Sequence, residues 1–212
     1  MAQITSILSL SDETGKDFLY VQEIKMKQKK ISASEMALIA VMAAVTCIMG
    51  PLSIPIPFSV VPISLTNLAV YLAIYVLGCR RGTLSYLVYL LLGLVGVPVF
   101  SGFSGGVGKL FGPTGGYLLG FIFMALICGW AIDHFSCKLV PSFIGMLLGT
   151  VVCYAFGTAW LAYQANLTFM AALAAGVLPF IPGDLAKMVI AAVLGPQIRR
   201  RLAQANLVRN ES

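Results

Sequence analysis

A lysine stands among glycines at residues 104–116, where the sequence reads SGGVGKLFGPTGG. Glycine-rich loops with a lysine often bind phosphate, but a P-loop needs Ser or Thr directly after the lysine. Here Leu110 follows Lys109, and Phe103 occupies the position of the first P-loop glycine. The dinucleotide pattern G-x-G-x-x-G fails too, because Phe111 stands where its third glycine belongs. The loop therefore predicts no nucleotide site.

A second group of polar residues interrupts an apolar stretch near the C-terminal end. Asp184 and Lys187 are three residues apart, so on a helix they share a face. Pro182 and Gly183 precede them and are typical of a helix start, where the helix dipole stabilises an anion such as Asp184. The pair is either an ion pair that fixes the helix end, or a clamp of one acceptor and one donor for a polar ligand in an apolar pocket.

The composition indicates the class of protein that holds these residues. Of the 212 residues, 59% are hydrophobic and 10% are charged, whereas soluble domains carry about 25% charged residues. So few charges cannot cover a water-exposed surface, and we expect an integral membrane protein. The net charge of +6 does not indicate nucleic-acid binding, because the basic residues flank apolar stretches and form no single basic face.

Six stretches are long enough to cross a membrane, for which a helix needs about 20 apolar residues. Clusters of Pro and Gly separate several of them. We therefore predict an all-α, polytopic membrane protein. It would consist of a polar N-terminal extension (1–31), a membrane domain of six transmembrane helices (32–202) and a tail (203–212). The expected spans are about 32–49, 62–79, 82–99, 114–133, 141–163 and 176–198.

The basic residues predict the orientation of these spans. If the spans alternate in direction, all of the 14 Lys and Arg residues except Lys109 and Lys187 lie on the side that holds the N-terminus. The positive-inside rule assigns that side to the cytoplasm. We therefore expect a multi-pass protein of the cell membrane, with both termini cytoplasmic and the glycine-rich loop on the outer face.

The glycine-rich loop has two interpretations. Six glycines at residues 104–116 allow close approach of the backbone, and irregular backbone at membrane depth is tolerated only where protein buries it or where it lines a cavity. The loop is either a solvated turn or a pocket wall to which Gly105, Gly106 and Gly112 contribute backbone groups. We expect the Lys109 side chain to be a solvated loop charge.

Three further side chains are weaker candidates for a ligand site. Asn67 begins the second span, where it can contact a ligand or satisfy the neighbouring backbone. Tyr154 and Trp160 lie on the fifth span, and either packing or an interfacial aromatic belt accounts for them. The alternative is that one of them stacks on a flat ring of a ligand.

The groups that an enzyme would need are missing from the sequence. The single histidine, His134, lies at the opposite end of its span from the level of Asp184, so no set of nucleophile, base and orienting residue forms. Without a Walker motif the chain cannot hydrolyse ATP. The five cysteines show no ligand spacing. We expect neither an enzyme nor a bound metal or cofactor.

Several stretches resemble the signature sequences of the BioY family, the biotin-binding S-components of energy-coupling factor (ECF) transporters. They are SGGVGKLFGPTGGYLLGF (104–121), GTAWL (157–161) and PFIPGDLAKMVIAAVLG (179–195), and IPIPFSVVPISLTN (54–67) is similar to the family's first outer loop. The resemblance covers residues 32–202. It implies a six-helix membrane protein that binds biotin from outside. A coupling protein and a pair of ATPases would complete the transporter, and ATP would bind only to those partners.

The resemblance also implies roles for the polar residues. The ureido ring of biotin has two N–H donors and one carbonyl acceptor. Asp184 would accept from the N–H groups, and Lys187 would donate to the ureido carbonyl or to the valerate carboxylate. Tyr154 or Trp160 would stack on the ring system, and the glycine-rich loop would form a backbone wall of the pocket.

A row of small residues on the first span suggests close packing against another helix. The row is either ordinary packing within the chain or, as the resemblance implies, the surface that docks the coupling protein. Its members recur at helical spacing and are Ala33, Ala37, Ala40 and Ala44.

Other functions stay open at this point. An S-component for another small vitamin would share the fold, but the FGPTGG and GDLAK elements argue against it. A membrane-embedded enzyme that processes a lipid would need a cluster of titratable groups at one depth, and the sequence offers only Asp184 and Lys187. In a structural bundle without a ligand, the same pair would only stabilise the fold.

Overall fold

The structure is a computed structural model that describes residues 32–57, 59–205 and 207. The chain divides into two compact units, residues 1–33 and 34–212, and apart from Ala33 the described helices and strands belong to the second unit. The expected N-terminal extension, 1–31, lies outside the described residues. Of the expected tail, only residues 203–205 and 207 are described.

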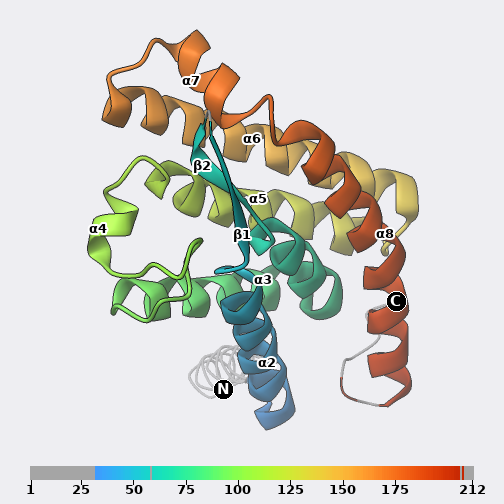
Figure 1. Cartoon of the computed structure of the whole chain (residues 1–212). Coiled ribbons are helices and arrows are strands. Elements are labelled where there is room, and N and C mark those ends of the chain that lie inside the picture. Colours follow the sequence, from blue (N-terminus) through green and yellow to red (C-terminus); the bar gives the residue numbers. More distant parts are fainter. Residues whose placement is uncertain (1–31, 58, 206, 208–212) are drawn as a thin grey trace, which may run out of the picture. The chain divides into compact units, whose positions relative to one another are not determined.

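The described part is mostly helical, with one small antiparallel hairpin (Figure 1). Its elements in chain order are α2 (Ala33–Met49), β1 (Ser53–Ile56), β2 (Ser59–Ser64), α3 (Thr66–Leu94), α4 (Val107–Leu110), α5 (Gly115–His134), α6 (Leu139–Ala165), α7 (Phe169–Gly176) and α8 (Ile181–Gln204).

Three described helices, α5, α6 and α8, are long and apolar enough to cross a membrane. The apolar helix α2 is shorter, with 17 residues. The second and third expected spans merge into α3, whose 29 residues include Arg80 and Arg81. The prediction of a mostly helical membrane protein is confirmed, whereas the number of crossings stays a prediction.

A sharp kink divides α3 into two helical segments. Gly78 has φ 78° and ψ 180°, a conformation that residues with a Cβ rarely adopt. The kink exposes the N–H groups that begin the second segment, and Cys79 N donates to Asp133 Oδ2 of α5 at 2.7 Å. The two segments pack closely beside the kink, because a Cβ on Gly82 would lie 2.9 Å from the Cα of Ile74.

Ion pairs fasten the helices near this kink. Arg199 of α8 lies 3.5 Å from Asp133 and donates to the sulfur of Cys137, at 3.2 Å. Arg81 pairs with Glu35 of α2 at 2.8 Å. Basic residues expected on one side of the membrane thus form contacts between helices that lie far apart in the sequence.

The hairpin β1–β2 corrects the expectation of a purely helical chain. Ser53 pairs with Ser64 and Ile54 with Ile63, and an irregularity separates these pairs from the pairing of Ile56 with Ser59. The proline-rich sequence IPIPFSVVP forms strands here because a sheet of two strands has only edges, and edge strands tolerate proline. The hairpin joins α2 to α3.

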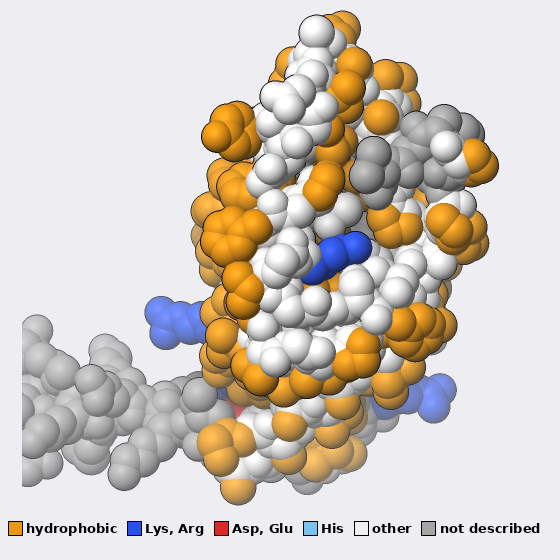
Figure 2. Space-filling model, turned by 60° about the vertical axis from the view of Figure 1, so that its left-hand side comes forward, with side chains coloured by type: hydrophobic (Ala, Val, Ile, Leu, Met, Phe, Trp, Pro, Cys, Tyr) orange, Lys and Arg blue, Asp and Glu red, His pale blue; other side chains and the backbone are white. Residues whose placement is uncertain are grey.

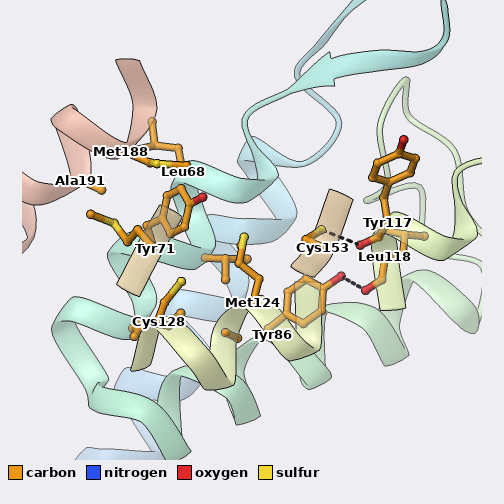
Figure 3. Close-up of a cluster of buried hydrophobic side chains, with 14 of the residues drawn as sticks. Leu68, Tyr71, Tyr86, Tyr117, Leu118, Met124, Cys128, Cys153, Met188 and Ala191 are labelled. Carbon is orange, nitrogen blue, oxygen red and sulfur yellow. Dashed lines mark hydrogen bonds between the residues drawn. The ribbon is translucent and has the colours of Figure 1, made fainter. Parts of the chain in front are cut away.

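The core lies where α5 packs against α6 and α3, and where α3 also packs against α8. Figure 3 shows Tyr86, Met124 and Cys153 within it. Tyr86 Oη donates to the carbonyl of Leu118 at 2.7 Å, which satisfies a hydroxyl that is fully enclosed by apolar side chains (Figure 3).

Glycines set the close approach of α5 and α6. A Cβ on Gly149 would lie 3.0 Å from the carbonyl oxygen of Met124, and a Cβ on Gly157 would overlap the ring of Tyr117. Between transmembrane helices, such close packing replaces the hydrophobic force that acts in water. The α5–α6 contact therefore depends on these two positions.

We predict that Gly157→Ala destabilises the protein. Its Cβ would displace Tyr117, whose hydroxyl donates to the carbonyl of Gly176 at 3.0 Å, and overpacking of this kind costs about 1–3 kcal/mol. Thermal unfolding in detergent should show a lower midpoint. The control is Gly183→Ala, where a Cβ would meet no described atom within 4 Å. Equal midpoints for the two variants would contradict the prediction.

Candidate functional site

A pocket lies between the hairpin, α3, the α4 region, α5, α6 and α8. Its empty space is about 720 Å³, which includes space that is open to solvent. Its charged lining residues in the described part are Lys109, Asp184 and Lys187. Figure 2 shows the side on which α4 lies, where a basic side chain occupies a hollow among backbone and apolar side chains.

The Asp184–Lys187 pair forms as predicted on the first turns of α8. The helix begins at Ile181 with Pro182 in its first turn, and Asp184 N donates to the carbonyl of Phe180 at 2.8 Å. Lys187 Nζ lies 2.9 Å from Asp184 Oδ1, and each residue is only 7% exposed. Charges buried this deeply are tolerated only when they are paired and hydrogen-bonded.

Two further groups complete the hydrogen bonding of this pair. Tyr154 Oη of α6 donates to Asp184 Oδ2 at 2.5 Å, and Lys187 Nζ donates to the carbonyl oxygen of Ser64 at the end of β2, at 2.7 Å. Both carboxylate oxygens therefore accept a hydrogen bond, and the ammonium uses two of its three donors. The network joins α6, α8 and the hairpin at the pocket wall.

Asn67 of α3 lines the pocket as the sequence suggested. It is 5% exposed, and its Oδ1 accepts from the backbone N–H of Leu68 at 3.1 Å. Within the described residues, its amide nitrogen has no hydrogen-bond partner. An amide nitrogen in the pocket lining can donate to a bound ligand.

Lys109 does not have the solvated position that we expected. It is half-buried and lines the pocket, and burial lowers the pKa of its ammonium group. In the described part of the chain, its side chain has no carboxylate partner. The sequence carried no local signal for this burial, because the surroundings of Lys109 depend on where α3 and α6 hold its loop.

The three glycines predicted to form a pocket wall do not line the pocket. Gly105 packs on the backbone carbonyl of Val97, where a Cβ would overlap it. Gly106 has φ 89° and donates its N–H to the carbonyl of Gly93 at 2.7 Å. These glycines therefore allow the loop to approach other backbone of the chain. The resulting contacts fix the loop around α4.

Gly112 and Trp160 also support the loop and do not reach the pocket lining. Trp160 Nε1 donates to the carbonyl of Gly112 at 2.9 Å, and its side chain packs where a Cβ on Gly116 would be. Gln164 Nε2 adds a hydrogen bond to the carbonyl of Phe111, at 2.6 Å. Tyr154, by contrast, does line the pocket, and a stacking contact of Trp160 with a ligand stays a prediction.

Aromatic residues that the sequence did not single out complete the lining, namely Tyr89, Tyr117, Phe121 and Phe180. Helices that are apolar on every side give no periodic signal for the face that turns towards a cavity. For Tyr117, its place directly after the GPTGG element was the only available indication.

The alanine row on α2 lies on the exposed face of the helix. Ala33, Ala37, Ala40 and Ala44 are all exposed, whereas the residues that α2 buries are Ile39, Ala43 and Thr46. Internal packing therefore does not explain the row in the described part of the chain.

The chain matches the model of the BioY family over residues 25–204. It is 37% identical over 171 residues to the biotin transporter BioY2 of Lactococcus lactis, with 81% of this chain and 93% of the relative covered. It is 40% identical over 174 residues to the biotin transporter BioY of Rhizobium etli, with 78% and 92% covered.

A solved structure has a similar fold. It is a crystal structure of the S-component for biotin from an ECF-type ABC transporter. The TM-score is 0.74 at 32% sequence identity, and the match covers 78% of this chain and 90% of the solved one.

We predict that Lys187→Met destabilises the protein more than the double variant Lys187→Met with Asp184→Asn does. The single change leaves the Asp184 carboxylate buried without its cation, which costs about 3–5 kcal/mol. Adding Asp184→Asn removes the unpaired charge, so the thermal unfolding midpoint of the double variant in detergent should lie above that of Lys187→Met. A double variant that is less stable than the single one would contradict this electrostatic account of the pair.

Proposed function

The chain belongs to the BioY family, and we propose that it takes up biotin across the cell membrane as the substrate-binding S-component of an ECF transporter. The observation that carries this proposal is the buried Asp184–Lys187 network at the wall of a largely apolar pocket. Biotin has the matching chemistry, because its ureido ring is polar on one edge while its thiophane ring and aliphatic chain are apolar. The function is binding and transport, not catalysis.

The free donors and acceptors in the pocket fit the ureido ring. Asp184 has lone pairs left to accept from a ureido N–H, since each carboxylate oxygen uses one in the network. Lys187 keeps one N–H, and the amide nitrogen of Asn67 is unsatisfied within the described residues. Both can donate to the ureido carbonyl. Tyr154 supports Asp184 by its hydrogen bond and offers a ring surface at the pocket wall.

We propose six membrane crossings, made by α2, the two segments of α3, α5, α6 and α8. The kink at Gly78 supports a reversal between the second and third crossings, since Arg80 and Arg81 come just after it. Arg199 lies close to the same end through its contact with Asp133. The positive-inside rule then assigns this end and both termini to the cytoplasm, and the pocket opens outward.

The proposed partners are a membrane-spanning coupling protein and two ATPase subunits. The exposed alanine row on α2 supports the first of these, because small residues allow a partner helix to approach closely. ATP would bind only to the ATPases, and the chain would need no cofactor of its own. Other exposed apolar residues would contact membrane lipid.

We predict that Asp184→Asn abolishes tight biotin binding, with at least about a hundredfold loss of affinity. The amide cannot offer the two acceptor oxygens of the carboxylate, and loss of a charged hydrogen bond costs about 1.5–3 kcal/mol before the disturbed Lys187 is counted. Equilibrium binding to detergent-purified protein measures this loss, with a structurally unrelated vitamin as the negative control.

The matched control for that experiment is Glu35→Gln, the same change of carboxylate to amide at a residue outside the pocket. It should bind biotin as the unmodified protein does. If folded, unmodified protein binds no biotin, the proposed function is wrong. If Asp184→Asn binds as tightly as the control, the Asp184–Lys187 pair is only structural.

We predict that Ala40→Leu impairs uptake without impairing binding. The added side chain would prevent close approach of a partner helix while leaving the pocket unchanged. Biotin binding by purified protein should match that of the unmodified chain, whereas ATP-dependent biotin uptake by cells should fall severalfold. The control is Ala159→Leu, at an exposed alanine of α6 outside the row. Equal uptake by both variants would exclude the α2 row as the docking face.

A further inference from the structure

The charges of the pocket do not cancel. Its charged lining residues in the described part of the chain are Lys109, Asp184 and Lys187. Asp184 and Lys187 neutralise each other at 2.9 Å, and Tyr154 and the Ser64 carbonyl add hydrogen bonds to this pair. Lys109 therefore leaves the pocket with one positive charge that no carboxylate in this lining compensates.

The backbone holds Lys109 in this position from both sides. Before it, Gly106 N donates to the carbonyl of Gly93 on α3, at 2.7 Å. After it, the carbonyls of Phe111 and Gly112 accept hydrogen bonds from Gln164 and Trp160 of α6. These hydrogen bonds fix the backbone around Lys109 beside the pocket, and the half-buried lysine is part of its lining. A cation that is partly removed from water is stabilised by an anion placed beside it.

We propose that Lys109 binds the carboxylate of the transported ligand and thereby fixes the direction in which the ligand lies in the pocket. This inference rests on the proposed function, since the valerate carboxylate is the one charged group of biotin at neutral pH. The acid end would lie beneath the loop around α4, and the ureido ring would lie at Asp184 on α8. The two helices lie on opposite sides of the bundle (Figure 1).

The same geometry excludes Lys187 as the partner of the carboxylate. Its Nζ is 2.9 Å from Asp184 Oδ1, so a carboxylate bound there would stand beside a second carboxylate. Like charges at such a distance repel, and one of them would have to take up a proton. A neutral ureido group at this end avoids the repulsion and uses the free donor of Lys187.

The test compares biotin with its primary carboxamide, which has nearly the same size and no charge. Equilibrium binding of both ligands is measured with the detergent-purified full chain and with Lys109→Met. Lys109→Met should lower the affinity for biotin about tenfold to a hundredfold, as expected for the loss of a hydrogen bond between charged groups. The carboxamide should bind the variant and the unmodified chain with affinities that agree within about twofold, since the lost interaction is with the charge.

Two further variants sharpen the result. Lys109→Arg keeps the charge and should retain most of the preference for biotin over the carboxamide. Asn67→Ala removes a donor from the proposed site of the ureido ring. It should lower the affinities for biotin and for the carboxamide by the same factor.

Three outcomes separate the explanations. Selective loss of biotin affinity in Lys109→Met supports the inference. Equal loss for both ligands, or no loss for either, overturns it while leaving the proposed function intact. If the folded, unmodified chain binds neither ligand, the proposed function itself fails and the role of Lys109 fails with it.

Discussion

A charge pair buried in apolar surroundings is the interaction on which the pocket depends. Either charge alone at this depth would be strongly destabilising, so Asp184 and Lys187 need each other and need partners for their remaining atoms. Tyr154 of α6 and the Ser64 carbonyl of β2 supply those partners. Three segments that are distant in sequence must therefore meet at the first turns of α8, and the pocket lies at their meeting point.

Glycine makes this meeting possible in two different ways. Between α5 and α6 it permits close helix packing: a Cβ on Gly120 would lie 3.0 Å from the sulfur of Cys153, one residue before Tyr154. In the loop around α4 and at Gly78 it permits backbone conformations and contacts that other residues would disturb. Helix packing positions Tyr154, and the loop positions Lys109. The positions of both polar side chains therefore depend on glycine.

Much of the helical frame could be predicted from the sequence, because length and hydrophobicity determine a membrane helix directly. The expected spans 114–133 and 141–163 correspond to α5 and α6 within about two residues. The expected span 176–198 does not correspond as well, because α8 begins only at Ile181 and residues 177–180 form a turn after the separate helix α7. The sequence did not reveal the merging of two spans into α3 either, since Asp133 stabilises the kink from another helix.

The site shows a different limit of sequence reasoning. The spacing of Asp184 and Lys187 predicted their pairing because three residues along a helix determine a shared face. No such local rule applies to Lys109, whose surroundings depend on where α3 and α6 hold its loop. One pocket lysine thus has a carboxylate partner within the described chain and the other has none. This inequality leaves the pocket lining with one uncompensated positive charge, and such a charge can orient a ligand that carries a single negative charge.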